Sequence, residues 1–231
     1  FYLPNSDFFI FLLISFAIFF TVNAFNLVDG MDGLCISISI FSFFIFAIFC
    51  FLQSLDFLFL VSLISFFSLI ALFIFNKPPA KYFLGDSGTH QLGFLVACIC
   101  LKIFMTENSG ENITEYVIND LDLIIFLIMI LGYPMFDAVY TPSYRLYHKK
   151  RPWIGDMNHP YHKLRLLGYN HFQILIFINI IHIVMISLAL MFFFYSNFFY
   201  PVILVILLLC VAKFLGRAEF DKLERMIETE K

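Results

Sequence analysis

The chain has 231 residues, of which 61% are hydrophobic and 13% are charged, and its formal net charge is −3. Water-soluble domains contain about 45–50% apolar and about 25% charged residues, so this composition excludes an ordinary soluble protein. The slightly negative charge gives no reason to expect a nucleic-acid partner. All five cysteines lie in apolar segments without CxxC or zinc-finger spacing, which argues against a redox or metal role for them.

Seven apolar segments approach the roughly 20 residues that a helix needs to cross a bilayer. The sequence therefore predicts an all-α polytopic membrane protein, with residues 1–231 forming one membrane-embedded domain. Mixed charges at helical spacing over 218–231 predict that the cytoplasmic tail, 217–231, is a solvated helix. The expected spans are 8–25, 33–52, 57–76, 88–105, 122–141, 172–194 and 199–216.

Basic residues predict the orientation of these spans. Lys and Arg gather in the loops near 76–88 and 142–171 and at the C-terminal end, whereas the loops on the opposite face carry mainly Asp and Glu. Because Lys and Arg mark cytoplasmic loops, we expect the first set of loops, together with the turn near 26–33, to face the cytoplasm.

The first polar motif, NAFNLVDGMDGL, ends the first span. Asn23, Asn26 and Asp29 follow one another at three-residue steps and so share one helical stripe, and Asp32 comes one step later. Both aspartates precede glycines, which would let the backbone turn sharply beside a ligand. Carboxylates at a membrane boundary are costly without a cation, a donor or water, so a Mg²⁺ or substrate site is favoured. A glycine-capped helix end with ordinary interfacial acids is the alternative.

The second motif, FNKPPAKYFLGDSGTHQLGF, joins the third and fourth spans. Asp86 lies where the fourth helix is expected to begin, and it is either an N-cap or part of a site. A helix start flanked by glycines offers free N–H groups to phosphate, where an Asp can hold Mg²⁺. Lys81 adds a positive charge nearby.

The third motif is the polar segment 144–170, predicted as a loop. A basic loop facing anionic headgroups explains its Lys and Arg residues, including Arg145, but not Asp156, His159 and His162. The histidines favour pyrophosphate or nucleotide binding, or proton transfer, over a zinc site. The buried Asp137 in the fifth span is a functional candidate because acids inside a membrane are costly.

Two polar residues of the sixth span, Asn179 and His182, have no matching acid in the sequence. We expect them to be hydrogen-bonded packing residues.

In this order and spacing, the three motifs resemble those of the polyprenyl-phosphate N-acetylhexosamine-1-phosphate transferases of glycosyltransferase family 4. The resemblance implies transfer of a HexNAc-1-phosphate group from a UDP-sugar to undecaprenyl phosphate or another polyprenyl phosphate. Among the N-acetylhexosamines, GlcNAc is the expected sugar. The products are polyprenyl-pyrophosphoryl-sugar and UMP, at the start of cell-envelope polysaccharide synthesis such as that of O-antigen. It further implies a multi-pass protein of the bacterial inner membrane that uses Mg²⁺, or Mn²⁺ in its place. A homodimer stays an open alternative.

The resemblance also implies roles for particular residues. Asp86 matches the Mg²⁺ ligand, with Asp29 as a second ligand that assists acceptor activation. The implied catalytic residues are Asp29, Asp32 and Asp86, and the implied substrate-binding residues are Asn23, Asn26, Lys81, Arg145, Asp156, His159 and His162.

The sequence departs from the family pattern in two places. Tyr161 stands where the second of three histidines is expected. The family's upstream Asp-Asp pair has no counterpart, so the chain resembles the C-terminal two-thirds of such an enzyme. We therefore expect residues 1–231 alone to be inactive, and the upstream spans, fused or supplied as a separate fragment, to restore synthesis. Phospho-MurNAc-pentapeptide transfer, a non-catalytic membrane protein and a secondary transporter remain alternatives.

Overall fold

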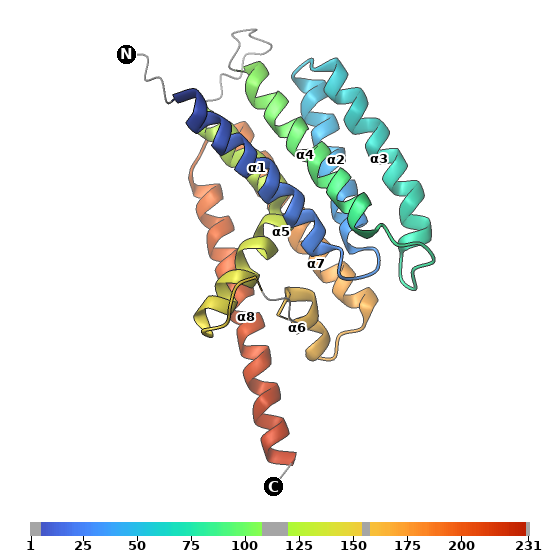
Figure 1. Ribbon diagram of the computed structural model, residues 1–231, viewed down its shortest axis with the longest axis vertical. Helices are drawn as coiled ribbons and strands as arrows, with labels where there is room; N and C mark the ends of the chain where they lie inside the picture. Colours follow the sequence, from blue (N-terminus) through green and yellow to red (C-terminus); the bar gives the residue numbers. More distant parts are fainter. Residues whose placement is uncertain (1–5, 108–119, 154–157, 230–231) are drawn as a thin grey trace.

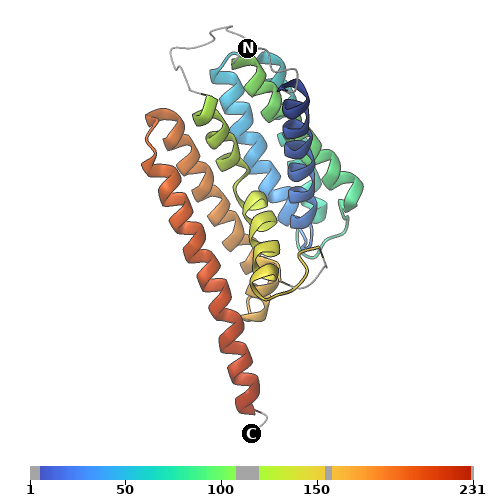
Figure 2. The same cartoon turned by 60° about the vertical axis from the view of Figure 1, so that its left-hand side comes forward.

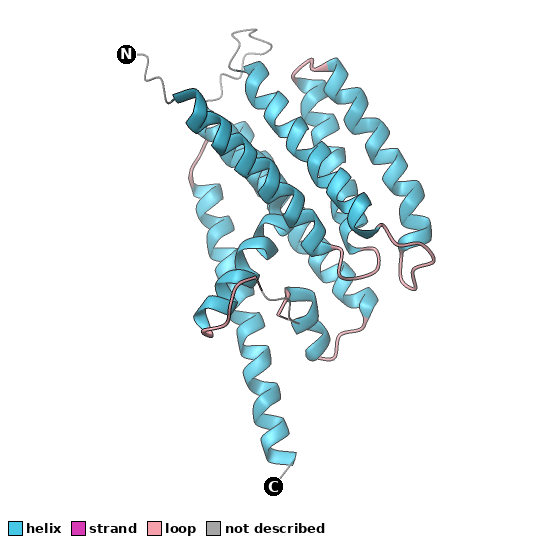
Figure 3. Cartoon of the chain, in the orientation of Figure 1, coloured by secondary structure: helices cyan, strands magenta, loops and turns pink. Residues whose placement is uncertain are grey.

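The computed structural model describes residues 6–107, 120–153 and 158–229 of the protein. Within these ranges the chain forms α-helices joined by short loops, without a β-strand (Figure 3). Such a helix satisfies its backbone hydrogen bonds within one segment, as a bilayer interior requires. The helices are α1 (Ser6–Val28), α2 (Leu34–Leu52), α3 (Asp56–Asn76), α4 (Gly85–Glu107), α5 (Asp120–Tyr147), α6 (Pro160–Leu166), α7 (His171–Tyr195) and α8 (Phe199–Thr229).

Seven of these helices, all but α6, are long and apolar enough to cross a membrane. This confirms the predicted fold class and places each span within a few residues of its predicted position. The largest difference is a helix that continues beyond its apolar segment: the fifth span was predicted to end at 141, but α5 continues to Tyr147. Helix α8 continues to Thr229, in agreement with the helix predicted for the tail. A span predicted from hydropathy ends where the residues become polar, whereas the helix itself can continue beyond the membrane into water.

The bundle is built around α2, which packs against α3, α5 and α7, while α1 packs against α4 and α5 (Figure 1). The outer helices α1, α3 and α8 present large apolar side chains outward, such as Phe16, Phe57 and Leu209. This apolar exterior fits a lipid environment, because lipid tails are as apolar as these side chains.

Helix α5 is broken near its middle. Gly132 has φ 31° and ψ −103°, and Pro134 within the same helix lacks a backbone N–H. At the break, the N–H of Tyr133 donates to Nδ1 of His182 in α7, at 3.4 Å. A backbone donor left unpaired in an apolar core would be costly, so His182 supplies the acceptor that the broken helix lacks.

Helix α7 is also bonded to α2 through polar side chains. Because the Tyr133 N–H can only donate, Nδ1 of His182 is the acceptor and Nε2 carries the hydrogen, 3.2 Å from Ser42 Oγ. Asn179 donates to Ser37 Oγ at 2.9 Å. The prediction that His182 and Asn179 are hydrogen-bonded packing residues is confirmed.

The turn 29–33, the loop 77–84 and the described parts of the connection 148–170, residues 148–153 and 158–170, lie at one end of the bundle, called the polar end below (Figure 1). The connection contains the short helix α6, which packs against α7 and α8. Helix α8 extends beyond the other helices at this same end (Figure 2). The fold thus brings the three polar motifs to one end of the molecule.

Candidate functional site

Side chains tie the first two motifs together. Gly33 provides the left-handed residue of the turn after α1, with φ 77°. Its N–H donates to Asn76 Oδ1 (3.0 Å), and Asn76 Nδ2 donates to the carbonyl of Tyr82 (2.7 Å). Asp32 Oδ2 accepts from the N–H of Ala80 at 3.0 Å. Asp32 therefore anchors the loop 77–84 to the turn that carries it.

Asn26 joins α1 to α4. Its Nδ2 donates to Asp86 Oδ1 and to Thr89 Oγ1, both at 3.0 Å. Asp86 lies inside the first turn of α4 rather than before it, so the N-cap alternative is not supported. Asn23 instead donates to a carbonyl of its own helix, four residues back. Of the two asparagines, only Asn26 is thus bonded to Asp86.

Asp29 is a half-buried carboxyl group close to Asp86. Burial and the negative charge of Asp86 raise the pKa of Asp29 to about 6, although a hydrogen bond from the backbone of Gly85 offsets part of the rise. Near neutral pH this group can therefore take up a proton or accept a cation. Lys81, predicted to bind substrate beside this pair, is exposed on the loop before α4.

Asp29 and Asp86 fit a Mg²⁺ ion bound together with phosphate. Mg²⁺ is typically held by one or two carboxylates, with water and phosphate oxygens completing its shell. A cation here would also relieve the repulsion that raises the pKa of Asp29. Among the residues that the structure describes, no three His, Cys, Asp or Glu side chains converge, so a metal would need ligands from substrate or water.

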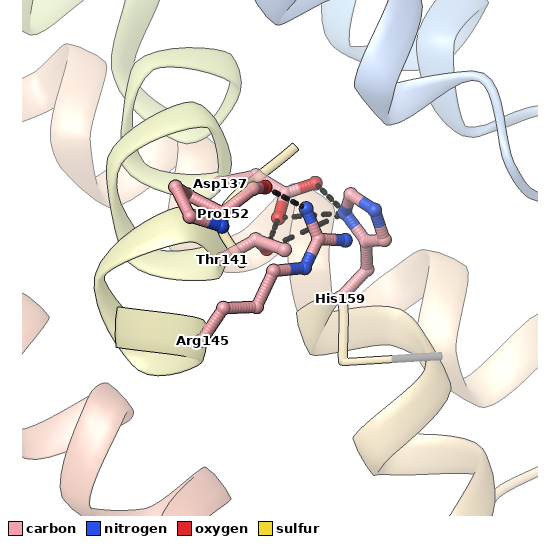
Figure 4. Close-up of polar contacts among 5 residues, drawn as sticks. All are labelled: Asp137, Thr141, Arg145, Pro152 and His159. Carbon is pink, nitrogen blue, oxygen red and sulfur yellow. Dashed lines mark hydrogen bonds and ion pairs between the residues drawn. The ribbon is translucent and has the colours of Figure 1, made fainter. Parts of the chain in front are cut away.

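A second cluster surrounds Asp137, which is fully buried in α5 (Figure 4). Thr141 Oγ1 donates to Asp137 Oδ1 at 2.7 Å, and His159 Nδ1 lies 3.1 Å from both carboxylate oxygens. An ionised carboxylate only accepts, so Nδ1 of His159 carries the hydrogen that is shared with Asp137. A carboxylate that orients an imidazole in this way prepares it for acid–base chemistry.

Arg145 lies beside this cluster in the last turn of α5. It is buried, its Nη1 donates to the carbonyl of Pro152 at 2.7 Å, and its guanidinium points toward the Asp137–His159 pair (Figure 4). The prediction that 144–170 is a loop is wrong at 144–147, which continue α5, and at 160–166, which form α6. Asp156 lies outside the described residues.

Tyr161 connects the two clusters. Its ring is stacked on His159 with centroids 5.6 Å apart, and it lies 4.3 Å from the ring of His162. Burial and the charges of Asp137 and Asp29 raise the pKa of Tyr161 to about 12. Because the ring of Tyr161 is stacked on His159 and its hydroxyl lies against Gly30, next to Asp29, the clusters of α1 and α5 are neighbours.

The sequence did not point to three residues of this site. Thr89 and Thr141 follow Asp86 and Asp137 by three and four residues, a helical spacing that was a usable signal. Lys163 is almost wholly buried, with Nζ 3.0 Å from the centroid of the Tyr144 ring. Its position depends on how α6 packs, which no local pattern encodes.

Comparison with known proteins identifies similar chains. Residues 2–104 match the family model of Glycosyl transferase family 4. The chain is 26% identical, over 64% of its length, to a protein of Bacillus subtilis named probable undecaprenyl-phosphate N-acetylglucosaminyl 1-phosphate transferase. It is 31% identical, over 61% of its length, to the undecaprenyl-phosphate alpha-N-acetylglucosaminyl 1-phosphate transferase of Thermotoga maritima. It is also 26% identical, over 78% of its length, to the phospho-N-acetylmuramoyl-pentapeptide-transferase of Carboxydothermus hydrogenoformans.

The matches cover only part of each relative, 38% of the first two and 49% of the third. The matched family segment contains Asn26, Asp29, Asp32 and Asp86, the residues that join α1 to α4. Over the matched segments the chain is similar to Glycosyl transferase family 4 proteins and to relatives named as polyprenyl-phosphate sugar-1-phosphate transferases.

Proposed function

We propose that the protein transfers GlcNAc-1-phosphate, or a related HexNAc-1-phosphate, from a UDP-sugar to undecaprenyl or another polyprenyl phosphate. A phosphate oxygen of the acceptor attacks the β-phosphorus of the UDP-sugar. The bond from that phosphorus to the bridging oxygen breaks, and UMP leaves with the bridging oxygen. The product is polyprenyl-pyrophosphoryl-sugar. Two relatives named as undecaprenyl-phosphate N-acetylglucosaminyl 1-phosphate transferases support this choice of sugar and acceptor.

The observation that supports the proposal best is the bond from Asn26 to Asp86 at the start of α4. It holds Asp86 next to Asp29 at a helix N-terminus, where unpaired N–H groups and the helix dipole favour phosphate. When bound to the two carboxylates, Mg²⁺ would supply positive charge against the pyrophosphate of the donor. Asn26 orients Asp86, and Asp29, beside Asp86, would assist activation of the acceptor phosphate.

The cluster in α5 would serve the phosphates of the sugar nucleotide. Arg145 contributes a buried positive charge, and His159, held by Asp137, presents Nε2 as a donor or acceptor. His162 lies on the same segment, beside the ring of Tyr161. Preorganised donors of this kind stabilise negative charge that develops on a transferring phosphoryl group.

The proposed setting is the bacterial inner membrane, with the polar end facing the cytoplasm. The relatives are bacterial, and Lys and Arg gather in the loops of this end. The reaction would begin the synthesis of a cell-envelope polysaccharide.

A second candidate is transfer of phospho-MurNAc-pentapeptide to the same kind of acceptor. It is favoured by the similarity to relatives named as phospho-N-acetylmuramoyl-pentapeptide-transferases, one of them 39% identical over 40% of the chain. The two candidates share the site and differ in the donor sugar.

The test compares Asp86→Asn with Asp56→Asn in membranes from cells that make the protein. Asp56 is a matched control, because it is also an exposed acid in the first turn of a helix but lies at the other end of the bundle. With labelled UDP-GlcNAc and undecaprenyl phosphate, Asp86→Asn should lower lipid-linked product by at least about 100-fold. Asp56→Asn should leave it unchanged.

Asn has nearly the same size as Asp, and its side-chain oxygen can still accept from Asn26, so lost folding would not explain such a result. Near-normal transfer by Asp86→Asn would remove the metal assignment. Product only with UDP-MurNAc-pentapeptide would select the second candidate. No product with either donor, even with the upstream spans supplied, would overturn the transferase proposal.

A further inference from the structure

Gly30 follows Asp29 in the first motif, yet its backbone does not need a glycine. Gly33, Gly85, Gly132 and Gly168 have positive φ values, and Gly30 does not. Both glycines lie in the turn between α1 and α2, as expected, but only Gly33 has a backbone conformation that favours glycine.

The space beside Gly30 is filled by Tyr161. A methyl group added at Gly30 would overlap the hydroxyl oxygen and Cζ of Tyr161, and would lie 3.2 Å from Cε1. The tyrosine is only 7% exposed, so its ring has little room to move aside. The absence of a side chain at Gly30 thus leaves the space that the hydroxyl end of the Tyr161 side chain occupies.

The other side of the Tyr161 ring faces the histidines of the third motif. It is stacked on His159, with an angle of 19° between the ring planes. His159 in turn is bonded to Asp137 of α5. A chain of contacts therefore runs from the turn that carries Asp29, through Tyr161 and His159, to α5.

We propose that Gly30 and Tyr161 form a steric lock that holds segment 159–162 against the turn after α1. Tyr161 is then a positioning residue: it fixes the imidazole of His159 relative to Asp29 without itself contacting the reacting atoms. The lock stands on packing alone, whereas its effect on catalysis rests on the proposed function. A residue that sets the distance between two parts of a site can change its rate by about 100-fold through a displacement of about 1 Å.

A size exchange tests the lock. Gly30→Ala should lower both the melting temperature of the purified protein in detergent and the initial rate of sugar-phosphate transfer, because the methyl group displaces Tyr161. Tyr161→Ala alone should lower the rate by roughly 10- to 100-fold. In the double variant, Tyr161→Ala should add little to the loss of stability, or recover part of it, because the clash is gone. If Gly30→Ala alone does not fold, recovery of folded protein in the double variant is the same test.

Gly33→Ala is the matched control. An alanine there is strained by φ 77° and meets Phe73 and Pro78 at 3.2 and 3.3 Å, away from Tyr161. Tyr161→Ala should not relieve the loss caused by Gly33→Ala.

Tyr161→Phe separates positioning from a general loss of stability. It keeps the ring that is stacked on His159, so we expect kcat to stay within about threefold of the parent, because the displacement that costs about 100-fold is avoided. Tyr161→Ala should lower kcat at saturating UDP-sugar even at temperatures where the variant is fully folded.

Two results would overturn the lock: a Gly30→Ala variant equal to the parent in melting temperature and rate, or losses in melting temperature that simply add in the double variant. If the melting temperatures show the coupling but neither parent nor variants transfer sugar phosphate, the lock stands and the proposed function fails. If transfer occurs without the coupling, the proposed function stands and the lock fails.

Discussion

The surroundings of Asp29 change the pKa of its carboxyl group. Burial and Asp86 raise its pKa from 3.8 to about 6. A folded-state pKa above the unfolded value means that the folded protein binds the proton more tightly. The contribution of Asp29 to stability is then fully present below about pH 4, and it is lost as the pH rises through about 6.

Asp29→Asn should therefore change the pH dependence of stability. The asparagine cannot ionise, so the melting temperature of the variant relative to the parent should rise between about pH 4 and about pH 6 and then level off. The measurement is thermal unfolding in detergent with a chelator present, which keeps divalent cations away from the carboxylates.

Asp86→Asn provides the control for this experiment. It removes the neighbouring charge, so in that background the same rise should occur at lower pH. A difference between Asp29→Asn and the parent that does not vary with pH would contradict this account of Asp29.

At the scale of a single helix, the break in α5 divides the helix into a half that packs in the core and a half that carries site residues. Residues before Gly132 pack in the apolar core, and those after Pro134 carry Asp137, Thr141 and Arg145 to the polar end. The direction of the second half is set where His182 accepts the N–H of Tyr133.

His182→Ala should destabilise the protein by about 1–3 kcal/mol, because it leaves a buried N–H without an acceptor. His182→Asn should lose less, because its side-chain oxygen can accept in place of Nδ1. Asn179→Ala is the comparison, since it removes a bond between α7 and α2 without touching the break. Thermal unfolding measures all three, and equal losses for His182→Ala and Asn179→Ala would show that the break does not depend on His182.

Hydropathy sufficed to predict the seven spans because crossing a bilayer needs only length and apolar composition. The motifs also indicated that Asn26 and Asp86 belong to one site. The sequence could not show that α5 breaks at Gly132, or that Gly30 makes room for Tyr161. Both depend on a partner far along the chain, His182 in one case and Tyr161 in the other, and local periodicity carries no information about such pairs.

For the whole molecule, the distribution of Lys and Arg predicts the orientation of the bundle in the membrane, with the polar end on the cytoplasmic side. Ser143 is exposed near the polar end, whereas Asn197 is exposed in the α7–α8 connection at the opposite end. Asn158, also in the third motif, is too buried to serve as a probe.

A membrane-impermeant maleimide should label Ser143→Cys only from the cytoplasmic side and Asn197→Cys only from the outside. The parent protein provides the blank, because its described cysteines lie within the apolar helices. The opposite labelling pattern would invert the topology and place the site away from any cytoplasmic UDP-sugar.

The bonds between the turn 29–33 and the loop 77–84 have a consequence for how the polar end opens. Asn76 is bonded to both segments, and the bond from Ala80 to Asp32 crosses between them a second time. Neither segment can lift away without breaking the bonds of the other, so the two share one cooperative opening event. In hydrogen-exchange measurements, the amides of Gly33 and Ala80 would then show one common opening free energy after correction for their intrinsic exchange rates, although they belong to different loops.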